Sequence, residues 1–188
     1  MSNIWMENWV SEDYKRLKQA DVNFLLDYYK RKPPGSLLDI GCGLAYETRA
    51  LQKEYNTKLW LLDGDADSNP QGRPTGWRGD AENMSFYNKL EELDKALKET
   101  GLTDYTLVDC NNISIHKKVK FDLIYSGISC GFHYEANTYK DLIKKHSHRK
   151  TKIIFDLRRK NLYQKDIEIV EILVRGRKHN KCLIKFKD

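Results

Sequence analysis

Residues 36–43 have the sequence SLLDIGCG, and this stretch decides the fold. A short apolar run that passes at once into glycine is typical of a buried strand followed by a tight turn. Gly41 and Gly43 allow such a turn and a close approach of a ligand to the backbone. The helix expected over residues 44–55 offers unpaired N–H groups at its start. The third glycine of the dinucleotide-binding fingerprint is absent, because the residues after Gly43 are LAY, so a pyrophosphate cradle is disfavoured.

Two carboxylates flank this turn. Asp39 comes just before it, where a negative charge repels phosphates and attracts an ammonium group. Asp63 ends a second apolar run, KLWLLD (58–63), twenty residues after Gly43. A carboxylate at that place can accept both hydroxyls of a ribose, although it can also be a simple turn residue at a strand end.

The rest of the chain alternates between helical and strand patterns. Apolar residues at helical spacing predict a helix within residues 11–32, which stops at the PPG of 33–35, and another that runs from about Phe86 to Gly101. Further strands are expected at 105–109, 121–126, 152–157, 167–174 and 181–186, with a helix at about 137–146. This order predicts an α/β, Rossmann-like, doubly wound sheet of seven strands, mostly parallel, with a C-terminal antiparallel hairpin.

Length and composition fit one domain. The chain has 188 residues, of which 40% are hydrophobic, so we expect a single domain over 1–188. Within it, residues 1–32 would form a helical lid or substrate segment, and residues 36–188 the cofactor-binding core.

The four cysteines never form a C-x-x-C pair, and neither a membrane span nor a signal peptide is apparent. The sequence therefore predicts a cytoplasmic protein with reduced thiols and no membrane association.

Charge is unevenly distributed. The formal net charge is +6, but residues 141–188 hold 15 Lys/Arg against 6 Asp/Glu. A basic C-terminal third suggests an acidic partner such as nucleic acid, although charge runs are usually solvated faces.

The motifs resemble those of class I S-adenosylmethionine-dependent methyltransferases. LLDIGCG is similar to the first motif of that family, LWLLDGD to the second, LVDCNN to the third and FDLIYS to the fourth, over roughly residues 20–188. The resemblance implies S-adenosylmethionine as cofactor. By position, it implies the following cofactor-binding residues: Asp39, Gly41, Cys42 and Gly43 for the methionine portion, Asp63, Gly64 and Asp65 for the ribose, Asp109, Cys110 and Asn111 for the adenine, and Ser126 beside both cofactor and substrate. For Asp109, followed by two asparagines, an Asx turn is the alternative.

The segment after the predicted fourth strand points to the acceptor. Residues 126–134 read SGISCGFHY, which places an imidazole at the mouth of the sheet. His133 is the candidate catalytic residue, a general base for a hydroxyl or amine, although it can also cap a helix or stack on Tyr134. The residues that follow the fourth and fifth strands depart from the pattern of metal-dependent O-methyltransferases, so no catalytic metal is predicted.

These features predict a methyltransferase for a small polar acceptor, with a sugar-like hydroxyl as the specific hypothesis. Two alternatives stay open from the sequence. One is an RNA or DNA methyltransferase that uses the basic C-terminal surface, and the other is a cofactor-binding partner subunit without activity.

Overall fold

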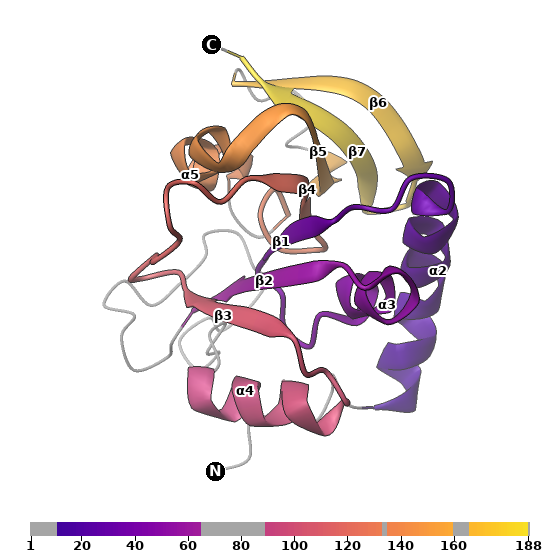
Figure 1. The fold of residues 1–188 in the computed structure, drawn as a ribbon. Helices are drawn as coiled ribbons and strands as arrows, with labels where there is room; N and C mark the ends of the chain where they lie inside the picture. Colours follow the sequence, from indigo (N-terminus) through magenta and orange to yellow (C-terminus); the bar gives the residue numbers. More distant parts are fainter. Residues whose placement is uncertain (1–10, 65–88, 133–134, 160–165, 188) are drawn as a thin grey trace, which may run out of the picture.

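The computed structural model describes residues 11–64, 89–132, 135–159 and 166–187. They build one seven-stranded sheet with helices on both faces, and the strand order is β3-β2-β1-β4-β5-β7-β6 (Figure 1). The strands are β1 (Ser36–Ile40), β2 (Lys58–Asp63), β3 (Tyr105–Asp109), β4 (Phe121–Ser126), β5 (Ser147–Arg158), β6 (Ile167–Arg175) and β7 (His179–Phe186). The first five pair in parallel, and β7 is antiparallel to both β5 and β6.

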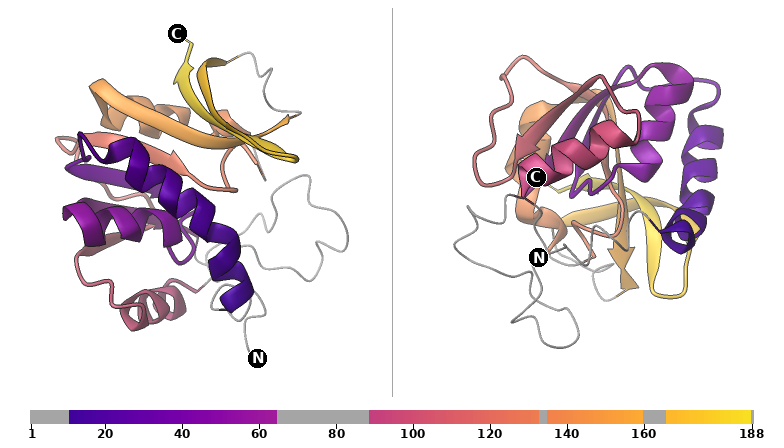
Figure 2. Two further views of the ribbon diagram at one scale, coloured as in Figure 1. Left: turned by 90° about the vertical axis from the view of Figure 1, so that its right-hand side faces the viewer. Right: turned by 90° about the horizontal axis from the view of Figure 1, so that it is seen from below.

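Two hydrophobic clusters hold the helices on the sheet. One joins α2 (Glu12–Tyr29), α3 (Tyr46–Tyr55) and α4 (Leu90–Glu99) to the sheet through residues such as Leu25, Leu51 and Leu93. The other packs η1 (Ala136–Tyr139) and α5 (Lys140–His146) through Ala136 and Ile143. Figure 2 (left) shows α2 lying across the sheet beside α3. Because the parallel strands are covered on both faces, they are apolar without alternation, which is what made them recognisable in the sequence.

The predicted fold class is confirmed, and the remaining differences lie at element ends. The strands predicted at 58–63, 105–109 and 121–126 have the observed bounds. The predicted strand at 152–157 begins earlier, at Ser147, and the helix expected at 137–146 is divided into η1 and α5. The added start of β5 is polar and mostly exposed, so hydrophobicity gave no signal for it.

The register aligns the predicted site residues at the carboxyl ends of the strands. Asp63, the last residue of β2, pairs with Asp109, the last residue of β3. On the other side of β1, Tyr125 of β4 pairs with Asp39, and further along the sheet Asp156 of β5 pairs with Lys181 of β7. Residues that pair across neighbouring strands project to the same face of the sheet. Several charged side chains therefore lie close together at the carboxyl-terminal edge of the sheet.

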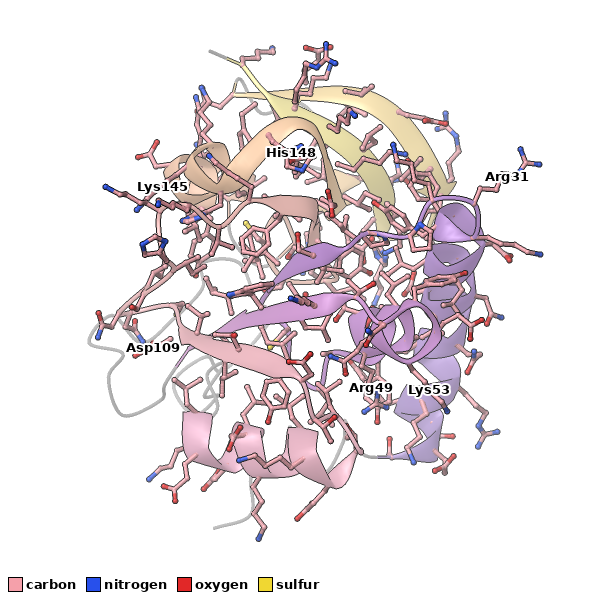
Figure 3. The ribbon with its side chains drawn as sticks, in the orientation of Figure 1. Arg31, Arg49, Lys53, Asp109, Lys145 and His148 are labelled. Atoms are coloured by element: carbon pink, nitrogen blue, oxygen red, sulfur yellow. The ribbon has the colours of Figure 1, made fainter. Side chains whose placement is uncertain are left out.

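Basic side chains lie on both sides of the sheet. Figure 3 shows Lys145 on α5 and His148 near the start of β5, whereas Arg49 and Lys53 lie on α3, which covers the opposite face. None of the described helices combines the length and the apolarity that a membrane crossing requires.

Candidate functional site

The turn after β1 has the open backbone that its glycines predict. Gly41 and Gly43 have φ values of 69° and 48°, in the left-handed region that glycine enters without strain. The N–H groups of Gly41 and Cys42 both donate to the carbonyl of Leu62, at 2.7 and 3.2 Å, which ties the turn to the end of β2. α3 then starts at Tyr46, and no side chain caps its first N–H groups, which face this turn.

Asp63 closes this turn from the side of β2. Its Oδ2 accepts the N–H of Gly43 at 2.9 Å and lies 3.8 Å from the thiol of Cys42, and its Oδ1 accepts the N–H of Gly64 at 2.8 Å. Burial raises the pKa of Asp63 to about 6, although the N–H groups of Gly43 and Gly64 oppose this. A carboxylate has about four acceptor positions, so Asp63 keeps capacity for further donors.

Asp39 is a second buried carboxyl group, 3% exposed, on the same face. Its Oδ2 accepts the hydroxyl of Thr48 in α3 at 2.6 Å. Burial raises the pKa of Asp39 to about 8, although the Thr48 hydroxyl opposes the rise. Near neutral pH this group is therefore mostly protonated, and a cation bound beside it would favour its ionised form.

Because the pKa of Asp39 is raised in the folded protein, we expect the free energy of unfolding to fall as pH rises. A carboxyl group that holds its proton more tightly in the folded state stabilises the fold most below the unfolded pKa, and this contribution is lost as pH rises through the folded value of about 8. Between pH 6 and pH 8 we expect the unfolding free energy of the wild type to fall by about 1–2 kcal/mol, since one pKa unit corresponds to about 1.4 kcal/mol. Asp39→Asn should remove this slope and be more stable than the wild type at pH 8. Urea unfolding at both pH values measures this, and a wild type that does not lose stability relative to Asp39→Asn contradicts it.

At the end of β3, Asp109 forms the Asx turn that the sequence left open as an alternative. Its Oδ1 accepts the backbone N–H of Asn111 at 2.8 Å and the Asn111 side-chain amide at 3.2 Å, so the Asx turn is present. The N–H of Cys110 donates to the carbonyl of Asp63 at 2.8 Å, which brings the ends of β2 and β3 together. The turn uses one carboxylate oxygen, which leaves Oδ2 of Asp109 compatible with the predicted adenine contact.

Ser126 fixes the chain where it leaves β4. The hydroxyl is fully buried, donates to the carbonyl of Ile40 at 2.8 Å and accepts the N–H of Cys130 at 2.9 Å. These contacts give its side chain a structural role, so the predicted contact with a cofactor would use its backbone. Gly127 follows in a confined place, because a Cβ there would lie 2.9 Å from the Tyr125 hydroxyl and 3.0 Å from Oε1 of Glu47.

A buried ion network, which the sequence analysis missed, lies beside Gly127. Lys18 of α2 donates to Oε1 of Glu47 in the first turn of α3 at 2.7 Å, and the Tyr125 hydroxyl lies 3.4 Å from the same oxygen. Lys181 donates to the Tyr125 hydroxyl at 2.9 Å and forms ion pairs with Asp156 at 2.7 Å and Asp21 at 3.3 Å. We call these six residues the buried ion network: Lys18, Asp21, Glu47, Tyr125, Asp156 and Lys181.

The charges of the network stabilise one another. Burial alone would raise the pKa of Glu47, but the ammonium groups of Lys18 and Lys181 outweigh it and lower that pKa. Burial would lower the pKa of Lys181, but Asp156 and Asp21 reverse the shift, so the pKa is raised. Two signals in the sequence could have found the network. Lys18 and Asp21 lie on the same helical face as Leu25, and Asp156 interrupts the apolar run IIFDL within β5.

The structure leaves part of the predicted site undescribed. His133, the predicted general base, and Asp65, the predicted ribose neighbour, lie outside the described residues. The other predicted cofactor-binding residues border one edge of the sheet, from the turn after β1 to the ends of β2, β3 and β4. Within the described ranges, no group of three or more His, Cys, Asp or Glu side chains is placed to hold a metal ion.

Solved structures share this fold. The ribosomal protein L11 methylase of Lactobacillus delbrueckii subsp. bulgaricus superposes with a TM-score of 0.59 at 14% identity, over 92% of this chain and 80% of the methylase. The SAH-bound methyltransferase PaMTH1 of Podospora anserina gives 0.54 at 12% identity, over 98% and 85% of the two chains. A methyltransferase of Pyrococcus furiosus gives 0.55 at 17% identity, over 89% and 81%.

At these identities the likeness establishes the fold. No protein-family model matches the sequence, and a search of curated proteins gave no match.

Proposed function

We propose that this chain, which has the fold of the class I S-adenosylmethionine-dependent methyltransferases, is itself such an enzyme and methylates a small polar acceptor. The observation that carries the proposal is the pairing of Asp63 with Asp109 at the carboxyl ends of β2 and β3, beside the glycine turn after β1. In open α/β sheets, ligands bind at this edge, and a carboxylate after the second strand is suited to ribose hydroxyls.

The charge of the site fits S-adenosylmethionine better than a dinucleotide. Asp39 and Asp63 are buried carboxyl groups beside the glycine turn, where they disfavour a pyrophosphate and favour a cation. When bound, S-adenosylmethionine supplies a reactive methyl group on a positively charged sulfur. Asp63 would hold the ribose with Gly64 beside it, Asp109, Cys110 and Asn111 would border the adenine, and Asp39, Gly41, Cys42, Gly43 and Ser126 would surround the methionine portion.

The acceptor side supports a small polar substrate. The segment after β4 packs against the ends of β5 and β7, since Gly131 accepts the N–H of Arg158 at 3.0 Å and the Phe132 ring lies 5.5 Å from the ring of His179. This places an apolar ring, a guanidinium and an imidazole beside one another at the sheet edge. A sugar-like hydroxyl compound, which offers both apolar faces and hydrogen-bonding groups, suits such a surface.

A labelled methyl-transfer assay tests the proposal. We expect the wild type to transfer tritiated methyl from S-adenosylmethionine to at least one member of a panel of monosaccharides, glycosides and phenols. Asp63→Ala should abolish the transfer, whereas Asp27→Ala, which changes an exposed carboxylate on α2, should retain it. If S-adenosylhomocysteine binds but no acceptor in the panel or in a small-molecule cell extract is labelled, the activity is refuted and the non-catalytic alternative is favoured.

A further inference from the structure

A group of exposed basic side chains lies at the amino ends of β4 and β5, at the opposite end of the sheet from the glycine turn. Residues 117–120 lead into β4, and residues 144–150 form the last turn of α5 and the start of β5. The two segments are in contact, because Nζ of Lys120 donates to the carbonyl of Lys145 at 2.6 Å. We call the following exposed residues the basic face: Lys117, Lys118, Lys120, Lys144, Lys145, Arg149 and Lys150.

Little negative charge balances the basic face. Oδ2 of Asp122 accepts the N–H groups of Gly35 and Ser36 at 2.8 and 3.2 Å, and its Oδ1 lies 3.1 Å from Nε2 of His148. Asp141, in the first turn of α5, is the other acidic residue nearby in these segments. In the part of the chain that the structure describes, six members of the basic face form no ion pair with a carboxylate: Lys117, Lys118, Lys120, Lys145, Arg149 and Lys150. The surface therefore attracts anions.

Part of the basic face stands on a bulge of β5. Phe121 of β4 pairs with Ser147, and the next pair of this ladder joins Leu123 to Lys152. One residue of β4 therefore lies opposite four residues of β5, those at 148–151. Extra residues on one strand cannot follow the ladder, so they project from it.

Hydrogen bonds within the bulge fix its shape. Oγ1 of Thr151 accepts the N–H of His148 at 2.7 Å and donates to the carbonyl of Phe121 at 2.6 Å. Nδ1 of His148 accepts the N–H of Lys150 at 3.1 Å. The backbone that carries Arg149 and Lys150 is thus ordered before any partner binds, which lowers the entropy cost of binding.

We propose that the basic face binds the phosphate backbone of a nucleic acid. A DNA duplex carries one negative charge per about 1.7 Å of its axis, and proteins that bind it neutralise several phosphates at once with Lys and Arg. The seven cations of the basic face supply such a set, and the bulge projects two of them beyond the sheet. An acidic peptide carries at most one side-chain charge per about 3.3–3.6 Å of its length, so it neutralises this surface less completely.

A membrane surface fits the basic face less well than a nucleic acid does. The exposed large apolar side chains of the described residues are those of Leu17, Ile113, Val170 and Val174, and none of them lies within 117–120 or 144–151. Binding in a membrane interface depends on apolar side chains that enter the acyl region as well as on basic ones. The basic face offers charge without such an anchor.

The basic face is a docking surface and not the acceptor site. β4 begins at Phe121, beside the basic face, and ends at Ser126, at the edge where the cofactor is proposed to bind. A strand of this length separates its two ends by about 17–20 Å. The inference therefore goes beyond the proposed function and does not depend on it, because a nucleic acid held here would place the protein without occupying the cofactor edge.

Fluorescence anisotropy of the full chain with fluorescein-labelled DNA and RNA duplexes tests the proposal. We expect the wild type to bind duplexes of about 20 base pairs, with a slope of log K against log salt of about −3 or steeper, because each neutralised phosphate contributes about −0.9. Absence of binding to both duplexes at about 50 mM salt, or a shallower slope, overturns the proposal.

Charge reversal on the bulge locates the binding surface. Arg149→Glu/Lys150→Glu should weaken binding by about 10-fold or more at about 100 mM salt and make the slope shallower by about 2. Lys53→Glu/Lys95→Glu makes the same change in net charge on α3 and α4, which cover the opposite face, and should stay within about threefold of the wild type. Figure 3 shows Lys53 and Lys145 at opposite sides of the molecule. Equal losses in the two variants, both folded by circular dichroism, would show that the basic face is not the binding surface.

Two further probes separate the classes of partner. Vesicles with about 30% phosphatidylserine present an anionic membrane, and polyglutamate of a length similar to the duplex presents an acidic peptide. We expect the wild type to bind both more weakly than the duplexes at the same salt concentration. Tighter binding of either probe refutes the assignment to nucleic acid.

Discussion

Asp63→Ala is expected to weaken the binding of S-adenosylhomocysteine by about 100-fold or more. A hydrogen bond to a charged group contributes about 1.5–3 kcal/mol, and the ribose would lose two of them. The change also releases the N–H groups of Gly43 and Gly64, which now donate to the carboxylate at 2.9 and 2.8 Å. Isothermal titration calorimetry of the variant and the wild type measures this difference.

Asp63→Asn separates the two effects, because it keeps the side-chain shape and one acceptor oxygen. We expect it to bind more weakly than the wild type and more tightly than Asp63→Ala. Asp27→Ala should bind as the wild type does. If Asp63→Ala is folded by circular dichroism and still binds S-adenosylhomocysteine within threefold of the wild type, the assignment of the ribose site to Asp63 is wrong.

Lys181→Ala is expected to lower the free energy of unfolding by about 3–5 kcal/mol. The Lys181 side chain is 2% exposed and forms ion pairs with Asp156 and Asp21. Its removal leaves the fully buried Asp156 without a cation, and an uncompensated buried charge is strongly destabilising. Since domains of this size are stable by only about 5–15 kcal/mol, the loss is easily measured by urea denaturation.

The double variant Lys181→Met/Asp156→Leu removes both members of the pair. Apolar residues of similar volume often replace a buried ion pair at little cost, so we expect this variant to regain most of the lost stability. Lys185→Ala, an exposed change on the same strand, should stay within about 0.5 kcal/mol of the wild type. A Lys181→Ala protein as stable as Lys185→Ala would show that the buried ion network does not stabilise the fold.

The sequence was sufficient for the fold because its strands carry two independent signals. The central residues of runs such as KLWLLD are apolar without alternation, as expected for strands covered on both faces, and a residue with a special role, such as Gly41 or Asp63, stands at the end of the run. The glycine turn and the carboxylates at strand ends were predictable for the same reason, since the topology brings the carboxyl ends of parallel strands to one edge.

The acceptor side was harder to predict because its residues meet only through tertiary structure. Asp156 and Lys181 lie 25 positions apart, and both strands carry other charged residues, so neither suggested a partner. Lys18 lies still further from Glu47 in the chain and would ordinarily be expected in solvent.

A crystal structure with S-adenosylhomocysteine bound tests the central claim most directly. The account predicts that both ribose hydroxyls donate to the Asp63 carboxylate, that the adenine lies beside Asp109 at the end of β3, and that the sulfur faces the segment after β4. A nucleoside bound elsewhere on the sheet, or no binding at millimolar concentration in crystals that leave this edge open, would contradict it.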